Sequence, residues 1–161
     1  MSDDNDKFKD FESFICSFLK NINAINDMRF LSIIMHQYID FYTDSVIKSS
    51  FNNPDVILKK PVIFGFYEKC LLLKALGFFD NDKGGKLLSN IRIINKIRNF
   101  YAHNLLDISS DENTPPNIKD QIKSMHNFGG ADLREDNSDS YNFKEICLST
   151  IAELSRIAKD D

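Results

Sequence analysis

The chain has 161 residues, of which 42% are hydrophobic and 27% charged, so it can bury the core of one domain without disulfides or metal ions. Its formal net charge of −4 argues against a protein that coats nucleic acid nonspecifically, because such binding depends on neutralising phosphates. The apolar runs are too short for the roughly 18–20 residues of a membrane span and the N-terminus is acidic, so we expect a cytoplasmic protein.

The three cysteines are far apart in the sequence, and each has apolar neighbours. They are Cys16, Cys70 and Cys147. This pattern predicts reduced thiols in the core, since neither CxxC nor CxH spacing occurs. We therefore expect no metal and no cofactor.

The N-terminal third predicts two helices. Residues 1–7 form an acidic lead that we expect to be disordered, and apolar residues recur at helical spacing from Phe8 to Ile22. From about Asp27 to Phe51 the chain has a broad apolar face and neither proline nor glycine, which predicts a long helix.

The middle of the chain predicts two more helices. The segment "NNPDVILKKP" is a loop by composition, and the next helix is expected to begin near Pro61 and to stop at Gly77. The segment "FFDNDKGGK" is predicted as a turn. A further helix is expected from about Lys86 to Leu106, with apolar residues three and four apart.

The remainder predicts loops around a short helix and a final long helix. Residues 107–117 form a loop by composition, 118–128 a short helix, and about 127–140 a mobile acidic loop. The last helix starts near Tyr141. With no strand-like alternation, we predict an all-α antiparallel bundle of four to five main helices, with residues 8–161 as a single domain.

One polar cluster interrupts the apolar ladder of the predicted helix 86–106. Arg98 can hold a phosphate at two points, and His103 can exchange protons near neutral pH. Asn99 lies four residues before His103, on the same helix face, and Ala102 leaves room for a substrate. No acidic residue occurs between Asp82 and Asp107, so this segment is locally positive. Its cations are Lys83, Lys86, Arg92, Lys96 and Arg98.

The segment "IRNFYAH", residues 97–103, resembles the RxxxxH signature of HEPN domains, a superfamily of small helical bundles of which many are metal-independent RNases of toxin–antitoxin and defence systems. The layout of about residues 28–107, with "LG" at 76–77 before this segment, is similar to the MltR (mannitol operon repressor)-like branch. The two ends of the chain are not covered by the resemblance.

The resemblance implies a homodimer whose cleft joins two copies of the motif and cleaves RNA without metal. His103 would be the general base or acid, Arg98 would stabilise phosphoryl charge, and Asn99 would orient the imidazole or the phosphate. Further candidates for supporting roles complete the predicted site. These are Asp40, Asp44, Lys96 and Tyr101. An antitoxin or a regulatory protein would be the expected partner.

Other interpretations stay open. Asn99 and His103 could cap the helix, and Arg98 could pair with Asp40 or Asp44. The protein would then be a noncatalytic MltR-like regulator or protein-interaction module, and no helix-turn-helix motif for reading DNA is evident.

Four further residues are expected to have structural rather than functional roles. His36 is expected to be a core or interface residue, and His126 to be solvated. Phe78 and Phe79 could stack on bases but are expected in the core.

Overall fold

The computed structural model describes residues 22–59, 64–104, 114–130, 133 and 138–158. The helix predicted to begin at Phe8 lies outside these residues except for Ile22, as does Cys16. Residues 131–132 and 134–137 of the acidic loop predicted at about 127–140 are also outside them. Six helices and no strand are found in the described part of the chain, so the predicted all-α bundle is confirmed.

The long helix α2, Met28–Ser50, closely matches the prediction. It begins after Asp27, whose side chain accepts a hydrogen bond of 2.8 Å from the backbone N–H of Arg29. The short helix α3, Asp55–Leu58, forms inside the segment predicted as a loop. The two prolines of this segment favour a loop. Proline is also compatible with the start of a helix, however, and Pro54 directly precedes α3.

Helix α4, Phe66–Ala75, begins later than predicted. Phe64 and Gly65 are described and are not helical, so the expected start near Pro61 is wrong. The predicted stop is confirmed: Gly77 has φ of 87°, a left-handed conformation that favours glycine after a helix.

Helix α5, Asp82–His103, begins four residues before the predicted start. The predicted turn "FFDNDKGGK" therefore contains the first helical turn. Asn81 caps it, because its Oδ1 accepts a hydrogen bond of 2.7 Å from the backbone N–H of Gly84. At the other end Asn104 closes the helix: its Nδ2 donates to the carbonyl of Phe100 at 2.7 Å.

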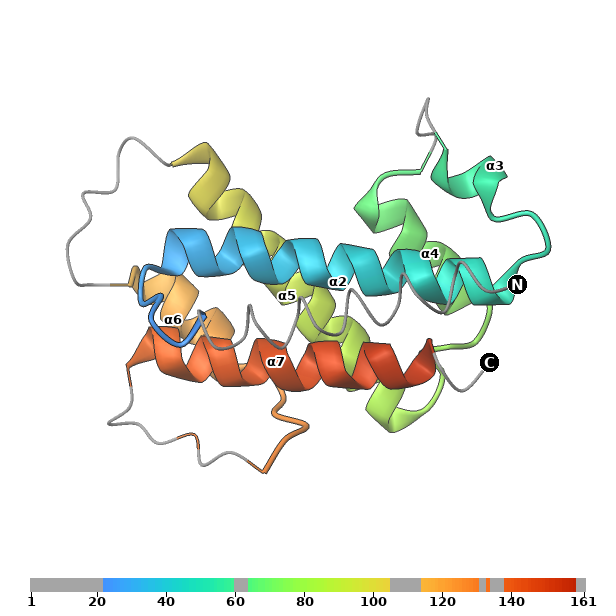
Figure 1. The fold of residues 1–161 in the computed structure, drawn as a ribbon. Coiled ribbons are helices and arrows are strands. Elements are labelled where there is room, and N and C mark those ends of the chain that lie inside the picture. Colours follow the sequence, from blue (N-terminus) through green and yellow to red (C-terminus); the bar gives the residue numbers. More distant parts are fainter. Residues whose placement is uncertain (1–21, 60–63, 105–113, 131–132, 134–137, 159–161) are drawn as a thin grey trace.

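The C-terminal part contains α6, Pro116–Lys123, and α7, Asp139–Ile157. Helix α7 starts at Ser138, whose hydroxyl accepts a hydrogen bond of 3.2 Å from the N–H of Tyr141. Helices α2 and α7 run in the same direction, and α5 crosses both in the opposite sense (Figure 1). The connection between α2 and α7 contains the other helices, so these two neighbours are free to be parallel.

The core lies where α2, α5 and α7 meet. Each contributes fully buried side chains, and their spacing of three or four residues puts them on one face of each helix. Examples are Leu31, Met35 and Ile39 of α2, Ile91, Ile94 and Ile97 of α5, and Phe143, Ile146 and Leu154 of α7.

An amide side chain is fully buried in this core. Asn90 of α5 is 0% exposed. Its Nδ2 donates to the carbonyl of His126 at 2.6 Å and to Oγ1 of Thr150 at 2.9 Å, and its Oδ1 accepts from the N–H of His126 at 2.8 Å. Asn90 therefore joins α5, the segment after α6, and α7.

Candidate phosphate site on helix α5

Helix α5 has an apolar face in the core and a polar face toward solvent. Arg92, Lys96 and His103 are exposed and Asn99 is half-buried. Their spacing of four, three and four residues aligns them along the helix. We call these four residues the α5 polar stripe.

Arg98 lies beside the α5 polar stripe and is half-buried. Its Nη1 donates a hydrogen bond of 2.9 Å to Oδ1 of Asn99. It forms no ion pair with any acidic residue that the structure describes. Its charge is therefore not neutralised by a neighbouring carboxylate within that part of the chain.

The three residues of the predicted motif do not meet at one point within a single chain. Arg98 and His103 are five residues apart, which is about 7.5 Å along the helix axis and places them on different sides of it. Asn99 connects the two, because it accepts from Arg98 and precedes His103 by one helical turn. The capping alternative does not hold for Asn99, since Asn104 makes the terminal hydrogen bond.

The structure does not show the alternative pairing of Arg98 with Asp40 or Asp44. Both carboxylates face Lys69 of α4 instead: its Nζ lies 2.9 Å from Oδ1 of Asp40 and 2.6 Å from Oδ1 of Asp44. Lys69 is 8% exposed. A lysine from the neighbouring helix thus occupies the position that the prediction gave to Arg98.

Burial and neighbouring charges shift the pKa values of Lys69 and Asp44 in opposite directions. Burial lowers the pKa of Lys69, but Asp44 and Asp40 more than offset this, so the pKa lies above its usual value. Burial also raises the pKa of Asp44, and Lys69 opposes that rise. The cluster of Asp40, Asp44 and Lys69 therefore holds α4 against α2 by charge in partly desolvated surroundings.

The other two supporting candidates have different positions. Lys96 is exposed on the α5 polar stripe, where a substrate could reach it. Tyr101 is 2% exposed, and burial raises its pKa to about 12. The structure places Tyr101 in the core rather than beside Arg98.

His36 of α2 is buried, as predicted for a core residue. It is 9% exposed, and its ring stacks at a tilt on Phe66 of α4, with 4.4 Å between ring centroids. Its Nε2 is buried and has no hydrogen-bond partner. Burial lowers the pKa of His36, and the positive charge of Arg98 lowers it further, while Asp40 and a hydrogen bond with Asn95 of α5 act in the opposite direction.

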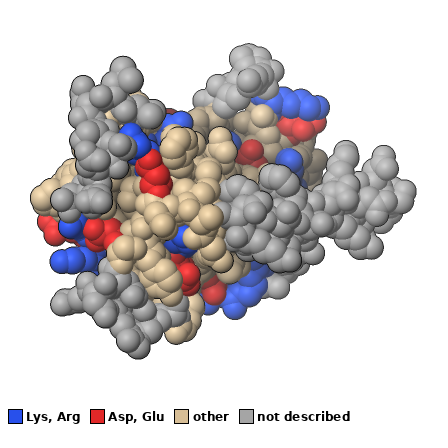
Figure 2. Space-filling model, turned by 60° about the vertical axis from the view of Figure 1, so that its left-hand side comes forward, with Lys and Arg blue, Asp and Glu red and all other residues tan. Residues whose placement is uncertain are grey.

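The positive segment divides into paired and unpaired cations. Nζ of Lys83 lies 2.7 Å from Oε2 of Glu153 in α7, and Nζ of Lys86 lies 2.6 Å from Oδ2 of Asp82. Arg92, Lys96 and Arg98 have no ion pair with described residues, so the unpaired charge is concentrated in the second half of α5. On the face shown in Figure 2, basic and acidic side chains are intermixed around other residues.

The remaining histidine, cysteine and phenylalanine predictions can be compared with the structure. His126 is exposed as expected. Cys70 and Cys147 are buried free thiols, and burial raises the pKa of Cys70 to about 12. Phe79 is 5% exposed and belongs to the core. Phe78 is partly buried and packs against the core.

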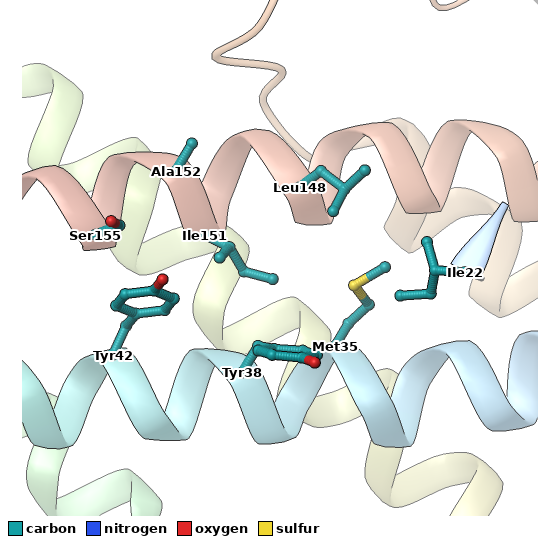
Figure 3. Close-up of a pocket in the computed structure, with 8 residues that line it drawn as sticks. All are labelled: Ile22, Met35, Tyr38, Tyr42, Leu148, Ile151, Ala152 and Ser155. Carbon is teal, nitrogen blue, oxygen red and sulfur yellow. The ribbon is translucent and has the colours of Figure 1, made fainter. Parts of the chain in front are cut away.

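An apolar cavity of about 220 Å³ lies between α2 and α7 (Figure 3). Met35, Tyr38 and Tyr42 line it from α2, and Leu148 and Ile151 line it from α7. The side chains that line it carry no formal charge, so it offers no chemistry comparable to that of Arg98.

Metal and membrane features were sought in the described ranges. They contain no group of three or more His, Cys, Asp or Glu residues that could hold a metal ion. None of the helices described is both long enough and apolar enough to cross a membrane.

No protein-family model, curated protein or solved structure matches the chain.

Proposed function

We propose that this protein is a metal-independent endoribonuclease of the HEPN type, with Arg98, Asn99 and His103 in the active site. The observation that carries the proposal is the state of Arg98. It is a half-buried guanidinium that contacts a neutral amide and has no ion pair with a described carboxylate. An arginine held in this way is available to an anionic ligand.

The proposed reaction is an internal transfer. The ribose 2′-oxygen forms a bond to the adjacent phosphorus, the bond from phosphorus to the 5′-oxygen breaks, and a 2′,3′-cyclic phosphate results. The proton of the 2′-hydroxyl goes to a base, and the leaving 5′-oxygen receives one. His103 would perform one of these proton transfers, and Arg98 would stabilise the charge on the phosphoryl oxygens.

A homodimer would bring the separated residues together. His103 and Arg98 lie on different sides of α5, so two antiparallel copies of this helix could place His103 of one copy near Arg98 of the other. The unpaired cations Arg92 and Lys96 would then be doubled along the cleft, which favours a single-stranded RNA. A toxin or defence role with an antitoxin partner is part of this proposal.

The test is RNA cleavage by the purified protein in EDTA. We expect wild type to release products that end in 2′,3′-cyclic phosphate and 5′-hydroxyl, and not to cut the 2′-deoxy version of the same oligonucleotide. His103→Ala should slow cleavage by about 10²–10⁴-fold, and Arg98→Ala by about 10²–10³-fold. The molecular mass in solution should show a dimer in every case.

Lys86→Ala is the matched control, because it removes a cation from the same helix that is already paired with Asp82. Cleavage should be nearly unchanged in this variant. A wild-type protein that leaves RNA intact, with Arg98→Ala and His103→Ala reducing dimerisation or helicity, would reject the nuclease and favour the noncatalytic MltR-like interaction module.

A further inference from the structure

The apolar cavity between α2 and α7 is lined by three segments that are distant in the sequence. Met35 and Tyr38 of α2 face Ile151 of α7 across it, and Ile22 lies at the end near Met35 (Figure 3). Ile22 is 0% exposed and is the first residue that the structure describes. Residues 1–21 therefore connect to the fold at one end of this cavity.

The turn that follows Ile22 is held against α7. Nζ of Lys144, a side chain that is 4% exposed, donates a hydrogen bond of 3.3 Å to the carbonyl of Asn23. The N–H of Ile25 donates to the carbonyl of Ile22 at 3.0 Å, in the turn that leads to α2. The position of Ile22 is therefore fixed relative to both walls of the cavity.

The sequence before Ile22 continues its apolar side as a stripe. We call residues 8–21 the N-terminal segment. At about 100° per residue, its apolar residues lie within about 80° of Ile22 on a helical wheel. They are Phe8, Phe11, Phe14, Ile15, Phe18 and Leu19, while Lys9, Ser13, Ser17 and Lys20 lie on the opposite side. Because Ile22 is at the centre of this stripe and lines the cavity, a helix that leads into it would present the stripe to the same cavity.

The length of the stripe also matches that of the cavity. Leu148 lines the cavity at the same end as Ile22, and Ser155 lines it at the other end (Figure 3). Seven residues separate Leu148 from Ser155 along α7, which is about 10.5 Å in a helix. The same separation joins Ile22 to Ile15. A helical N-terminal segment antiparallel to α2 would therefore place Ile15 beside Ser155 and Phe18 between them and Ile22.

We infer that the N-terminal segment docks as an amphipathic helix into the cavity between α2 and α7 of its own chain. Its phenylalanine and aliphatic side chains occupy the space of about 220 Å³, and its lysine and serine side chains face solvent. The occupant of this cavity is thus a part of the protein itself and not a small apolar ligand. The inference is independent of the nuclease proposal, because it uses no residue of the RxxxxH motif.

A single introduced tryptophan tests the docking, because the protein contains none. Phe18→Trp puts an indole on the apolar stripe, and Ser17→Trp is the matched control on the opposite side of the same turn. We expect the fluorescence of Phe18→Trp to lie at shorter wavelength than that of Ser17→Trp. It should also be quenched several-fold less by acrylamide, since an indole between α2 and α7 is shielded from water.

Substitutions in the wall and in the segment locate the docked helix. In the Phe18→Trp protein, Ser155→Glu puts a charge at the half-buried end of the cavity and should raise quenching toward the level of Ser17→Trp. Gln37→Glu is the control, because Gln37 is exposed on α2 and does not line the cavity; it should change nothing. Ile15→Lys should also raise quenching, and combined with Ser155→Glu it should restore part of the protection through an ion pair.

The outcomes decide between the possible occupants. Equal quenching of Phe18→Trp and Ser17→Trp overturns the inference. Protection that neither Ser155→Glu nor Ile15→Lys reduces also overturns it, because the segment would then lie elsewhere. Protection that is lost on dilution would mean that the segment of a second copy fills the cavity. Ile15→Lys leaves α2 and α7 intact, so the test does not depend on whether Ser155→Glu folds.

Discussion

Asn90 shows how much one buried amide can hold together. It satisfies the N–H and the carbonyl of His126 and contacts Thr150. We expect Asn90→Leu to lower the free energy of unfolding by about 3 kcal/mol, because the backbone groups of His126 lose their partners inside the protein. Urea unfolding of both proteins measures the difference.

Thr150→Val is the comparison variant for Asn90. It removes one hydrogen bond to Asn90 and leaves the backbone groups of His126 paired, so we expect a loss of about 1 kcal/mol. If Asn90→Leu and Thr150→Val lower the free energy of unfolding equally, the hydrogen bonds of Asn90 to the backbone of His126 contribute little to stability.

The partners of individual side chains were the hardest feature to predict from the sequence. The sequence could pick out Arg98, Asn99 and His103 from their spacing, but not the ion pairs of Asp40 and Asp44. Lys69 is followed by apolar residues in "EKCLLLK", and nothing in that pattern indicates that it points toward α2. His36 lies in an apolar segment of the sequence, which gives no indication that the charge of Arg98 on α5 lowers its pKa.

At the level of elements, the first turn of α5 depends on two adjacent glycines with opposite environments. A Cβ at Gly84 would lie 2.7 Å from Cα of Phe79 and 2.9 Å from the carbonyl oxygen of Phe78, whereas a Cβ at Gly85 would meet nothing within 4 Å. We expect Gly84→Ala to lower the free energy of unfolding by about 2 kcal/mol, because backbone must move to make room.

Gly85→Ala should have the opposite sign. The position is exposed and helical, and alanine is favoured over glycine in a helix by up to about 1 kcal/mol. Thermal unfolding of the two alanine variants and of wild type measures both effects. If Gly84→Ala and Gly85→Ala both destabilise the protein, the close approach of Gly84 to Phe79 does not distinguish the two glycines.

Helix interiors were predictable, whereas the starts of α4 and α5 were not. The apolar spacing in α2 and α7 is long and regular, so both helices were expected close to their observed bounds. The start of α5 was missed because glycine pairs usually indicate a turn, while here Asn81 caps the helix and Gly84 lets it approach Phe79. Gly65 directly precedes α4 and has extended backbone, so the helix begins only at Phe66.

At the scale of the whole molecule, the ion pairs of Lys69 with Asp40 and Asp44 join α4 to α2 and should make the free energy of unfolding depend on pH. Lys69→Met would leave Asp40 and Asp44 facing each other without a cation. Without Lys69 the pKa of Asp44 would rise further in the folded state, and a group with a raised pKa stabilises the fold at low pH and loses that contribution as the pH rises through it. We expect a loss of about 1–2 kcal/mol near neutral pH, after allowance for solvent screening.

The measurement for Lys69→Met is urea unfolding at about pH 4 and about pH 7.5. The variant should approach wild-type stability at the lower pH, where the raised pKa of Asp44 favours its protonated form. Lys86→Met is a control, since its ion pair with Asp82 is at the surface. A loss that is the same at both pH values would assign the effect of Lys69 to packing of its side chain rather than to charge.

The contact between Asn90 and His126 also affects the entropy of the chain. The connection from Asn104 to Ser138 joins two helices of the core and contains α6, and fixing His126 divides it into two shorter segments. Closing a loop costs free energy that grows only with the logarithm of its length. Residues could therefore be inserted on either side of this anchor at little cost, while the position of α5 relative to α7, and with it Arg98, stays the same.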